Sequence, residues 1–176
     1  MKVESMFLTT ALLLFPALNA RAADVASGRD AKSAFERLKG LVGEWEGHVV
    51  TSDGQPPTTI RYEATSAGSV VMERLRIGAD TEMVSMFHLD GKDLVLTHYC
   101  AAGNQPHLRW NPAKSTATEL AFDFVRGGNM DPAVDGHMHS GRMLLKNGAH
   151  LENVWIGWEG GKPAGEKRFI VTRKKP

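Results

Sequence analysis

Residues 137–158 read HMHSGRMLLKNGAHLENVWIGW, and Asn147-Gly148 divides this stretch into two runs in which apolar and polar residues alternate. Alternation with a period of two is typical of a β-strand with one buried face. Asn-Gly between two such runs is a strong hairpin signal, because a type I′ turn needs a positive φ at both central residues. The stretch therefore predicts two antiparallel strands joined by a two-residue turn.

The predicted turns also fix which residues face each other across each hairpin, because a slip of one residue would turn every side chain to the other face. A second turn is predicted at Gly91-Lys92. The expected pairs around Asn147-Gly148 are Lys146–Ala149, Leu145–His150, Met143–Glu152, His139–Ile156 and His137–Trp158. The expected pairs around Gly91-Lys92 are Leu89–Leu94, Phe87–Leu96, Ser85–His98 and Met83–Cys100.

Similar short runs rich in Val, Ile, Thr and aromatic residues follow one another along the chain, separated by Gly, Asp, Asn and Pro. This spacing leaves no room for βαβ crossovers and favours antiparallel meander connections, as in a barrel or sandwich. The predicted strands are Trp45–Thr51, Thr58–Thr65, Ser69–Ile77, Met83–Leu89, Leu94–Cys100, Leu108–Asn111, Glu119–Val125, His137–Lys146, His150–Trp158 and Lys167–Arg173.

One helix is predicted before these strands. Apolar residues from Ala31 to Val42 recur at the i, i+3, i+4, i+7 spacing of a helical face. Asp30 is a suitable N-cap, and Gly40 or Gly43 can end the helix.

The composition is that of one ordinary globular domain, with 176 residues, 42% of them apolar and 23% charged. The net charge of +1 lacks the basic excess of most nucleic-acid-binding proteins, so no nucleic-acid partner is expected. A single cysteine, Cys100, excludes an internal disulfide framework and a Cys₄ or Cys₂His₂ zinc site.

The first residues resemble an export signal. Lys2 precedes an apolar run from Met6 to Leu18, and Ala20-Arg21-Ala22 places small residues at the positions that a signal peptidase requires. The run is too short for a stable membrane-spanning helix. We therefore expect a signal peptide at residues 1–22, a flexible lead-in at 23–30 and one domain at 31–176. The mature protein would be periplasmic or extracellular, with no stable membrane span after cleavage.

Several segments resemble a family of small secreted bacterial proteins of unknown function, which is related to lipocalin-like (calycin) barrels. These segments are Gly43-Glu44-Trp45-Glu46-Gly47, Leu96-Thr97-His98-Tyr99-Cys100-Ala101-Ala102-Gly103-Asn104-Gln105-Pro106, Asp135-Gly136-His137-Met138-His139, Trp155 and Phe169–Arg173.

The resemblance implies a mainly β fold, a closed antiparallel up-and-down barrel of about 8–10 strands with one N-terminal helix near a mouth. It brings no established activity. A more distant likeness is to nitrobindin-type haem barrels. There the haem-ligating histidine sits on the last strand, whereas Lys167–Arg173 contains no histidine.

The first candidate site lies in the segment from His98 to Gln105. His98 and Cys100 are two residues apart on a predicted strand and so share a face, with Ser85 and Met83 expected opposite. A histidine, a thiol and a thioether could hold a soft metal ion. The alternatives are core packing, or a ligand contact by His98, Asn104 and Gln105, whose amides could also tie down the loop backbone.

The second candidate is His137-Met138-His139, whose two histidines share a strand face and could chelate an ion if a third ligand were near. A polar network, or packing of His137 on Trp158, is the alternative. Among the aromatic residues, Trp45 is expected to plug the barrel beneath the helix. Trp155 and Trp158 have opposite parity, so both cannot face inward on a regular strand.

Together these observations predict an exported protein that binds a small, partly apolar molecule in the barrel cavity, since a closed barrel of this size can hold one ligand. The step from barrel to binding protein rests on analogy. The predicted ligand-binding residues are His98, Asn104, Gln105, His137, His139 and Trp155, with no catalytic residue and no cofactor. The alternatives left open are a metal- or haem-binding envelope protein, a His-based enzyme in the same cavity, and a filled barrel that acts only as an interaction module.

Overall fold

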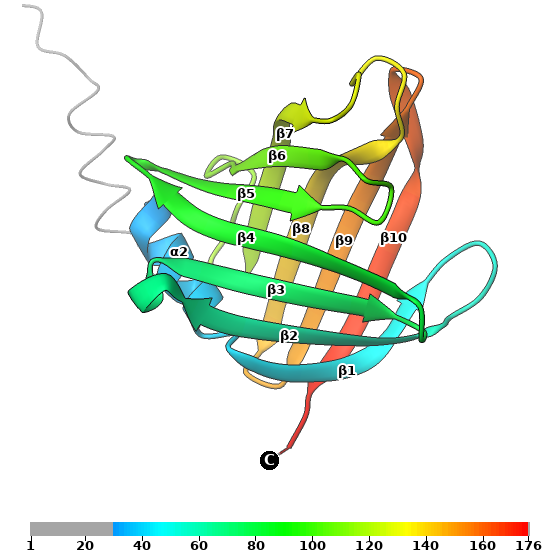
Figure 1. Ribbon diagram of the computed structural model, residues 1–176. Coiled ribbons are helices and arrows are strands. Elements are labelled where there is room, and N and C mark those ends of the chain that lie inside the picture. Colours follow the sequence, from blue (N-terminus) through cyan, green and yellow to red (C-terminus); the bar gives the residue numbers. More distant parts are fainter. Residues whose placement is uncertain (1–29, 176) are drawn as a thin grey trace, which may run out of the picture.

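The computed structural model describes residues 30–175. Ten antiparallel strands follow one another in chain order around a closed barrel, with β1 hydrogen-bonded to both β2 and β10 (Figure 1). The strands are β1 Gly43–Val50, β2 Pro57–Thr65, β3 Val70–Ile77, β4 Thr81–Asp90, β5 Asp93–Tyr99, β6 Gln105–Trp110, β7 Glu119–Gly128, β8 His137–Asn147, β9 His150–Glu159 and β10 Lys162–Arg173.

The predicted fold class is therefore confirmed, with a strand at each of the ten predicted places. The largest boundary difference is at β10, which begins five residues before the predicted Lys167 and continues the turn after β9. The predicted signal peptide at 1–22 and the predicted lead-in before Asp30 lie outside the described residues.

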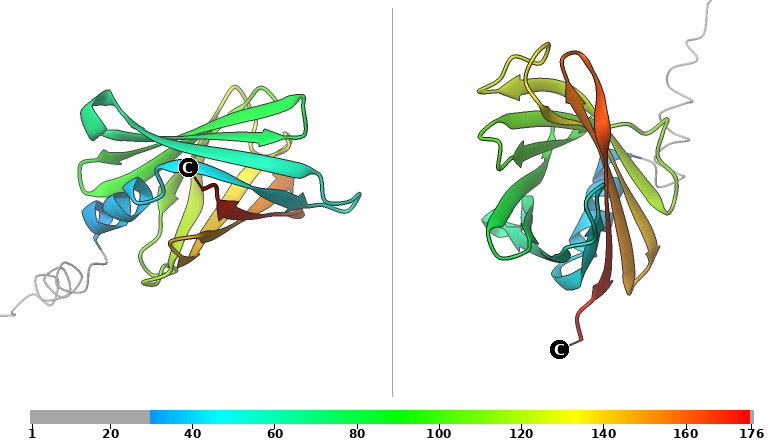
Figure 2. Two further views of the ribbon diagram at one scale, coloured as in Figure 1. Left: turned by 90° about the horizontal axis from the view of Figure 1, so that it is seen from below. Right: turned by 90° about the vertical axis from the view of Figure 1, so that its right-hand side faces the viewer.

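The helix α2 spans Ala31–Lys39, and the short 3₁₀ turn η1 spans Ser66–Gly68. Asp30 caps α2 as predicted, because its carboxylate accepts a hydrogen bond from the Ser33 backbone N–H at 2.9 Å. The helix lies beside one end of the barrel, where it contacts β2, β4 and β5 (Figures 1 and 2). We call this the helix end, and the opposite end, formed by the β1–β2, β3–β4, β5–β6, β7–β8 and β9–β10 connections, the loop end.

Apolar side chains fill the interior next to the helix. Trp45 is buried there as predicted, and its indole N–H donates to the Leu41 carbonyl at 2.9 Å. Phe87 and Phe122 meet edge to face, with ring centroids 5.7 Å apart. This packing closes the helix end of the barrel against solvent.

The β4–β5 register is confirmed for the predicted pairs Leu89–Leu94, Phe87–Leu96 and Ser85–His98. The expected pair of Met83 and Cys100 does not form. Strand β5 ends at Tyr99, and the Cys100 backbone N–H instead donates to the Asn104 carbonyl at 3.1 Å. This contact turns the chain out of the sheet.

The β8–β9 register is confirmed where His137 lies opposite Trp158, but it shifts by one residue at a bulge between Met138 and Ser140. The observed partners beyond the bulge are Ser140–Ile156, Met143–Asn153, Leu144–Glu152 and Leu145–Leu151, and a second shift between Leu145 and Asn147 places Asn147 opposite His150. The predictions that His139 faces Ile156, that Met143 faces Glu152 and that Leu145 faces His150 are therefore wrong.

The predicted type I′ turn at Asn147-Gly148, with Lys146 opposite Ala149, is also wrong. The loop residues are Gly148 and Ala149, and Gly148 does not have a positive φ. The reason is local, because the Asn147 side-chain oxygen accepts a hydrogen bond from the Ala149 backbone N–H at 2.9 Å. This Asx interaction replaces the backbone turn that Asn-Gly more often makes.

Candidate functional site

A row of buried polar side chains crosses four neighbouring strands inside the barrel. Tyr62 on β2 lies opposite Glu73 on β3, Glu73 lies opposite Ser85 on β4, and Ser85 lies opposite His98 on β5. Because directly opposed residues share a face of the sheet, the four side chains meet on the inner wall. Each of them is at most 3% exposed.

Hydrogen bonds join this row into one chain. The Tyr62 hydroxyl donates to one carboxyl oxygen of Glu73 at 2.5 Å, and the Ser85 hydroxyl donates to the other at 3.1 Å. Nδ1 of His98 lies 3.0 Å from the Ser85 oxygen. From β9, the Asn153 amide donates to the Tyr62 oxygen at 3.1 Å. We call these five residues, Asn153, Tyr62, Glu73, Ser85 and His98, the polar chain.

The donors of the polar chain fix the tautomer of His98 when Glu73 is ionised. A carboxylate accepts hydrogen bonds and donates none, so Tyr62 and Ser85 must both donate to Glu73. The Ser85 hydroxyl has one proton and has used it, so its oxygen accepts from His98. His98 then carries its proton on Nδ1, and Nε2 is an unprotonated acceptor. Within residues 30–175, Nε2 makes no hydrogen bond.

Burial disfavours charge on two members of this chain, His98 and Glu73. It lowers the pKa of His98 to about 4, with a further contribution from the positive charge of Lys167. It also raises the pKa of Glu73, while the hydrogen bonds from Tyr62 and Ser85 act in the opposite direction. His98 is therefore a neutral imidazole at physiological pH.

Lys167 and Trp155 lie opposite each other on β10 and β9 and are placed to face the same interior. Trp155 is buried on the inner face. Lys167 has the same inward register as Phe169 and Val171, two and four residues further along, but it is exposed. An inward-facing lysine that stays exposed indicates that solvent reaches this part of the inner wall.

Gly141 allows the Trp155 indole to lie flat along the wall. The two residues are opposite each other on β8 and β9, and a Cβ placed on Gly141 would overlap the six-membered part of the ring. A glycine is needed here for close approach by a ring, and positive φ plays no part. The ring therefore takes up the space of a missing side chain on β8.

His137 and His139 form a second, separate cluster at the loop end. The bulge in β8 brings both imidazoles against Phe124, with centroid distances of 4.8 and 5.0 Å. His139 also stacks on Trp158 at 4.1 Å, so it lies between two aromatic rings. The predicted packing on Trp158 is thus made by His139, because the bulge shifts its position.

Hydrogen bonds orient this histidine pair. Nδ1 of His137 lies 2.8 Å from the Asp135 carbonyl oxygen, which can only accept, so this nitrogen carries a proton. Nε2 of a neutral His137 must then accept from Nδ1 of His139, 3.0 Å away. Burial lowers the pKa of His139, the electrostatic effect of the His137 imidazole lowers it further, and Asp123 opposes this shift.

Asn104 and Gln105 hold the loops at this end in place. Their amides bond to backbone carbonyls, which is one of the two roles predicted for them. The Asn104 amide donates to the Gly136 carbonyl at 2.8 Å, which joins the β5–β6 loop to the segment before β8. The Gln105 amide donates to the Gly103 carbonyl at 3.0 Å. The Asn104 side-chain oxygen is buried with no hydrogen-bond partner.

Four of the six predicted site residues fall into two separate groups, while Gln105 bonds only within its own loop and Trp155 lies opposite Lys167. His98 belongs to the polar chain, and His137 and His139 belong to the aromatic cluster, to which Asn104 is linked through Gly136. Sequence reasoning missed Glu73, Tyr62, Asn153 and Lys167. The sequence did contain a sign that Glu73 is buried, because it alternates with Val71 and Leu75 and so shares their inward face of β3.

Residues 30–175 contain no group of three or more His, Cys, Asp or Glu side chains that could hold a metal ion. Cys100 is a half-buried free thiol. No helix in the same part of the chain is long and apolar enough to cross a membrane.

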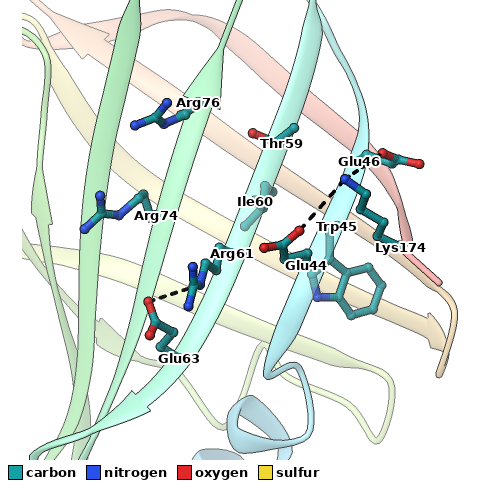
Figure 3. Close-up of a pocket in the computed structure, with 10 residues that line it drawn as sticks. All are labelled: Glu44, Trp45, Glu46, Thr59, Ile60, Arg61, Glu63, Arg74, Arg76 and Lys174. Atoms are coloured by element: carbon teal, nitrogen blue, oxygen red, sulfur yellow. Dashed lines mark ion pairs between the residues drawn. The ribbon is translucent and has the colours of Figure 1, made fainter. Parts of the chain in front are cut away.

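A groove of about 380 Å³ lies on the outer wall of the barrel, over β1, β2 and β3 (Figure 3). Its charged side chains are largely paired with one another, for example Arg61 with Glu63 at 3.2 Å. Lys174 lies 4.0 Å from both Glu44 and Glu46. The groove is therefore close to electrically balanced, and sequence reasoning did not identify it.

No protein-family model matches the chain, and no curated protein matches it. Among solved structures, the chain is similar to a protein of unknown function from the DUF3598 family of Nostoc punctiforme PCC 73102. The two share 14% sequence identity with a TM-score of 0.51, over 78% of this chain and 49% of the other. The chain thus spans about half the length of that protein, and the likeness concerns the fold alone.

Proposed function

We propose that this protein binds a small, partly apolar molecule inside the loop end of the barrel. The proposal is carried by one observation: Lys167 faces the interior opposite Trp155 yet stays exposed, and its charge contributes to the lowered pKa of His98. The helix end is packed with apolar side chains and leaves the loop end as the entrance. The Trp155 ring would offer an apolar face, and His98 a polar contact.

Rigid support of His98 favours a binding role over simple packing. His98 bonds directly to Ser85, and Ser85 is in turn fixed by Glu73, which also accepts from Tyr62. A binding group is most effective when its orientation is fixed in advance by surrounding hydrogen bonds. The calycin relationship and export through residues 1–22 remain parts of this proposal.

The test is a titration of ¹⁵N-labelled protein with octan-1-ol and with sodium octanoate, followed by NMR. The indole N–H signals are assigned by replacing each tryptophan in turn. The signals of Trp155 and His98 should shift, while that of Trp45 beneath the helix should not. Shifts confined to the outer groove, at Arg61 or Arg74, or no shift with either compound, would contradict the proposal.

A further inference from the structure

The polar chain can hold its protons in two arrangements, and the difference appears at His98. With Glu73 ionised, Nε2 of His98 is bare, as derived above. With a proton on the Glu73 oxygen nearest Ser85, that carboxyl donates to Ser85. The Ser85 hydroxyl then donates to Nδ1 of His98, and the imidazole carries its proton on Nε2.

The change from the first arrangement to the second takes up one proton. The Nδ1–H proton of His98 moves to the Ser85 oxygen, and the Ser85 hydroxyl proton moves to Glu73. A proton from solvent then binds Nε2 of His98. The three residues gain one positive charge in total, and the charge that disappears is the buried carboxylate.

We propose that the ligand is an organic anion whose carboxylate lies between Lys167 and the Nε2–H group of His98, and that the polar chain takes up one proton as this anion binds. The inference rests on the proposed function and adds the ligand class. A carboxylate needs donors, and the second arrangement supplies one beside a lysine.

Charges around the polar chain favour this coupling. The groups in contact with Glu73 are Tyr62 from β2 and Ser85 from β4, and neither is a cation. The charge that acts on His98 is that of Lys167 from β10. An anion beside Lys167 would offset that charge and favour a proton at Nε2. Burial already raises the pKa of Glu73 and favours the proton it must receive.

The test is isothermal titration calorimetry with sodium octanoate in phosphate and in Tris buffers, from pH 6.5 to 9. The dependence of the binding enthalpy on the buffer gives the number of protons taken up. Wild type should rise toward one proton per octanoate at the high end of this range. Glu73→Gln should bind octanoate with no proton uptake at any pH, because its amide donates permanently to Ser85. Exposed Glu63→Gln is the matched control and should behave as wild type.

Two further measurements keep the inference falsifiable if Glu73→Gln does not fold. Lys167→Met should weaken octanoate binding at least about tenfold, a loss of about 1.4 kcal/mol. It should leave octan-1-ol binding unchanged, because the charged donor to the carboxylate is the group removed. The ¹⁵N shifts of His98 should report a proton on Nδ1 in free wild type at high pH and on Nε2 in the octanoate complex.

The outcomes separate this inference from the proposed function. Binding of octan-1-ol without binding of octanoate would overturn the inference and leave the proposed function standing. Octanoate binding with no proton uptake by wild type would also overturn the inference and leave the proposed function standing. Binding of neither compound would overturn both.

Discussion

The hydroxyl oxygen of Ser85 lies 3.0 Å from Nδ1 of His98, and the two residues face each other across β4 and β5. This contact links the part of the barrel that sequence reasoning identified to the part it missed. On one side of Ser85 is a predicted ligand-binding histidine. On the other is Glu73, a buried carboxyl group that sets which nitrogen of His98 carries the proton.

The low pKa of His98 makes stability depend on pH. Its folded pKa of about 4 lies below the ordinary histidine value of 6.5, so between these values the unfolded chain binds more protons. The free energy of unfolding should therefore fall as pH falls through this window, by up to about 1.4 kcal/mol per pH unit from this group. Urea unfolding at pH 7.5, 5.5 and 4.5 measures this change in the free energy of unfolding. His98→Gln should lose this component, and exposed His150→Gln should keep it. Parallel profiles for wild type and His98→Gln would show that His98 does not contribute.

The hydroxyl of Tyr62 should contribute measurably to stability. Tyr62→Phe would leave one carboxyl oxygen of Glu73 and the Asn153 amide N–H without a hydrogen-bond partner, while Ser85 still donates to the other Glu73 oxygen, at a cost of about 1–3 kcal/mol per buried group. Urea unfolding provides the free energy. Tyr99→Phe is the matched control, because Tyr99 is 49% exposed and should change stability by less than about 0.5 kcal/mol. Equal effects of the two changes would mean that the polar chain does not stabilise the barrel.

A methyl group at position 141 should displace the Trp155 ring. Gly141→Ala is expected to destabilise the protein by about 1–3 kcal/mol, because the new Cβ would overlap the indole. Gly148→Ala, in the turn of the same hairpin, meets open space and is the control. Combining Gly141→Ala with Trp155→Leu should cost less than the two single changes added together. Full additivity would show that the two residues do not share this space.

Protonation of His139 should quench the fluorescence of Trp158. The two rings are stacked with centroids 4.1 Å apart, and an imidazolium accepts an electron from an excited indole. Burial lowers the pKa of His139, so the midpoint of the quenching should lie below the ordinary value of 6.5. The measurement is the tryptophan emission from pH 8 to 4, in wild type and in His139→Gln. An identical decrease in both proteins would mean that a group other than His139 causes the quenching. His48→Gln is the control and should show the same pH dependence as wild type.

The sequence predicted the architecture because strand and turn signals are local. Alternation, turn residues and one capped amphipathic helix are enough for ten strands and α2, and the Gly91-Lys92 turn placed Ser85 opposite His98 correctly. The β8–β9 register failed because a bulge next to His139 is an insertion that alternation does not show. That bulge also decides which histidine meets Trp158.

The missed part of the site depends on contacts between distant strands. Tyr62 and Asn153 are 91 residues apart, and a hydrogen bond between β2 and β9 cannot be derived from hairpin registers. Glu73 could have been identified from the sequence. A carboxylate that alternates with core residues of its strand must be buried, and it then needs hydrogen-bond donors from the neighbouring strands. The position of Lys167 was harder to predict from the sequence. Its strand begins before the predicted start, and its partner Trp155 lies across a hairpin that contains a bulge.

The measurement that tests the central claim most directly is a native mass spectrum of the purified protein, compared with the denatured mass and with Trp155→Ala. The protein is measured as isolated and again after equilibration with octan-1-ol and with sodium octanoate. The account predicts one bound molecule per wild-type chain that disappears on denaturation and is markedly reduced in Trp155→Ala. A wild-type spectrum that shows the bare chain under all three conditions, or an adduct equally abundant in Trp155→Ala, would contradict a ligand site at the inner wall.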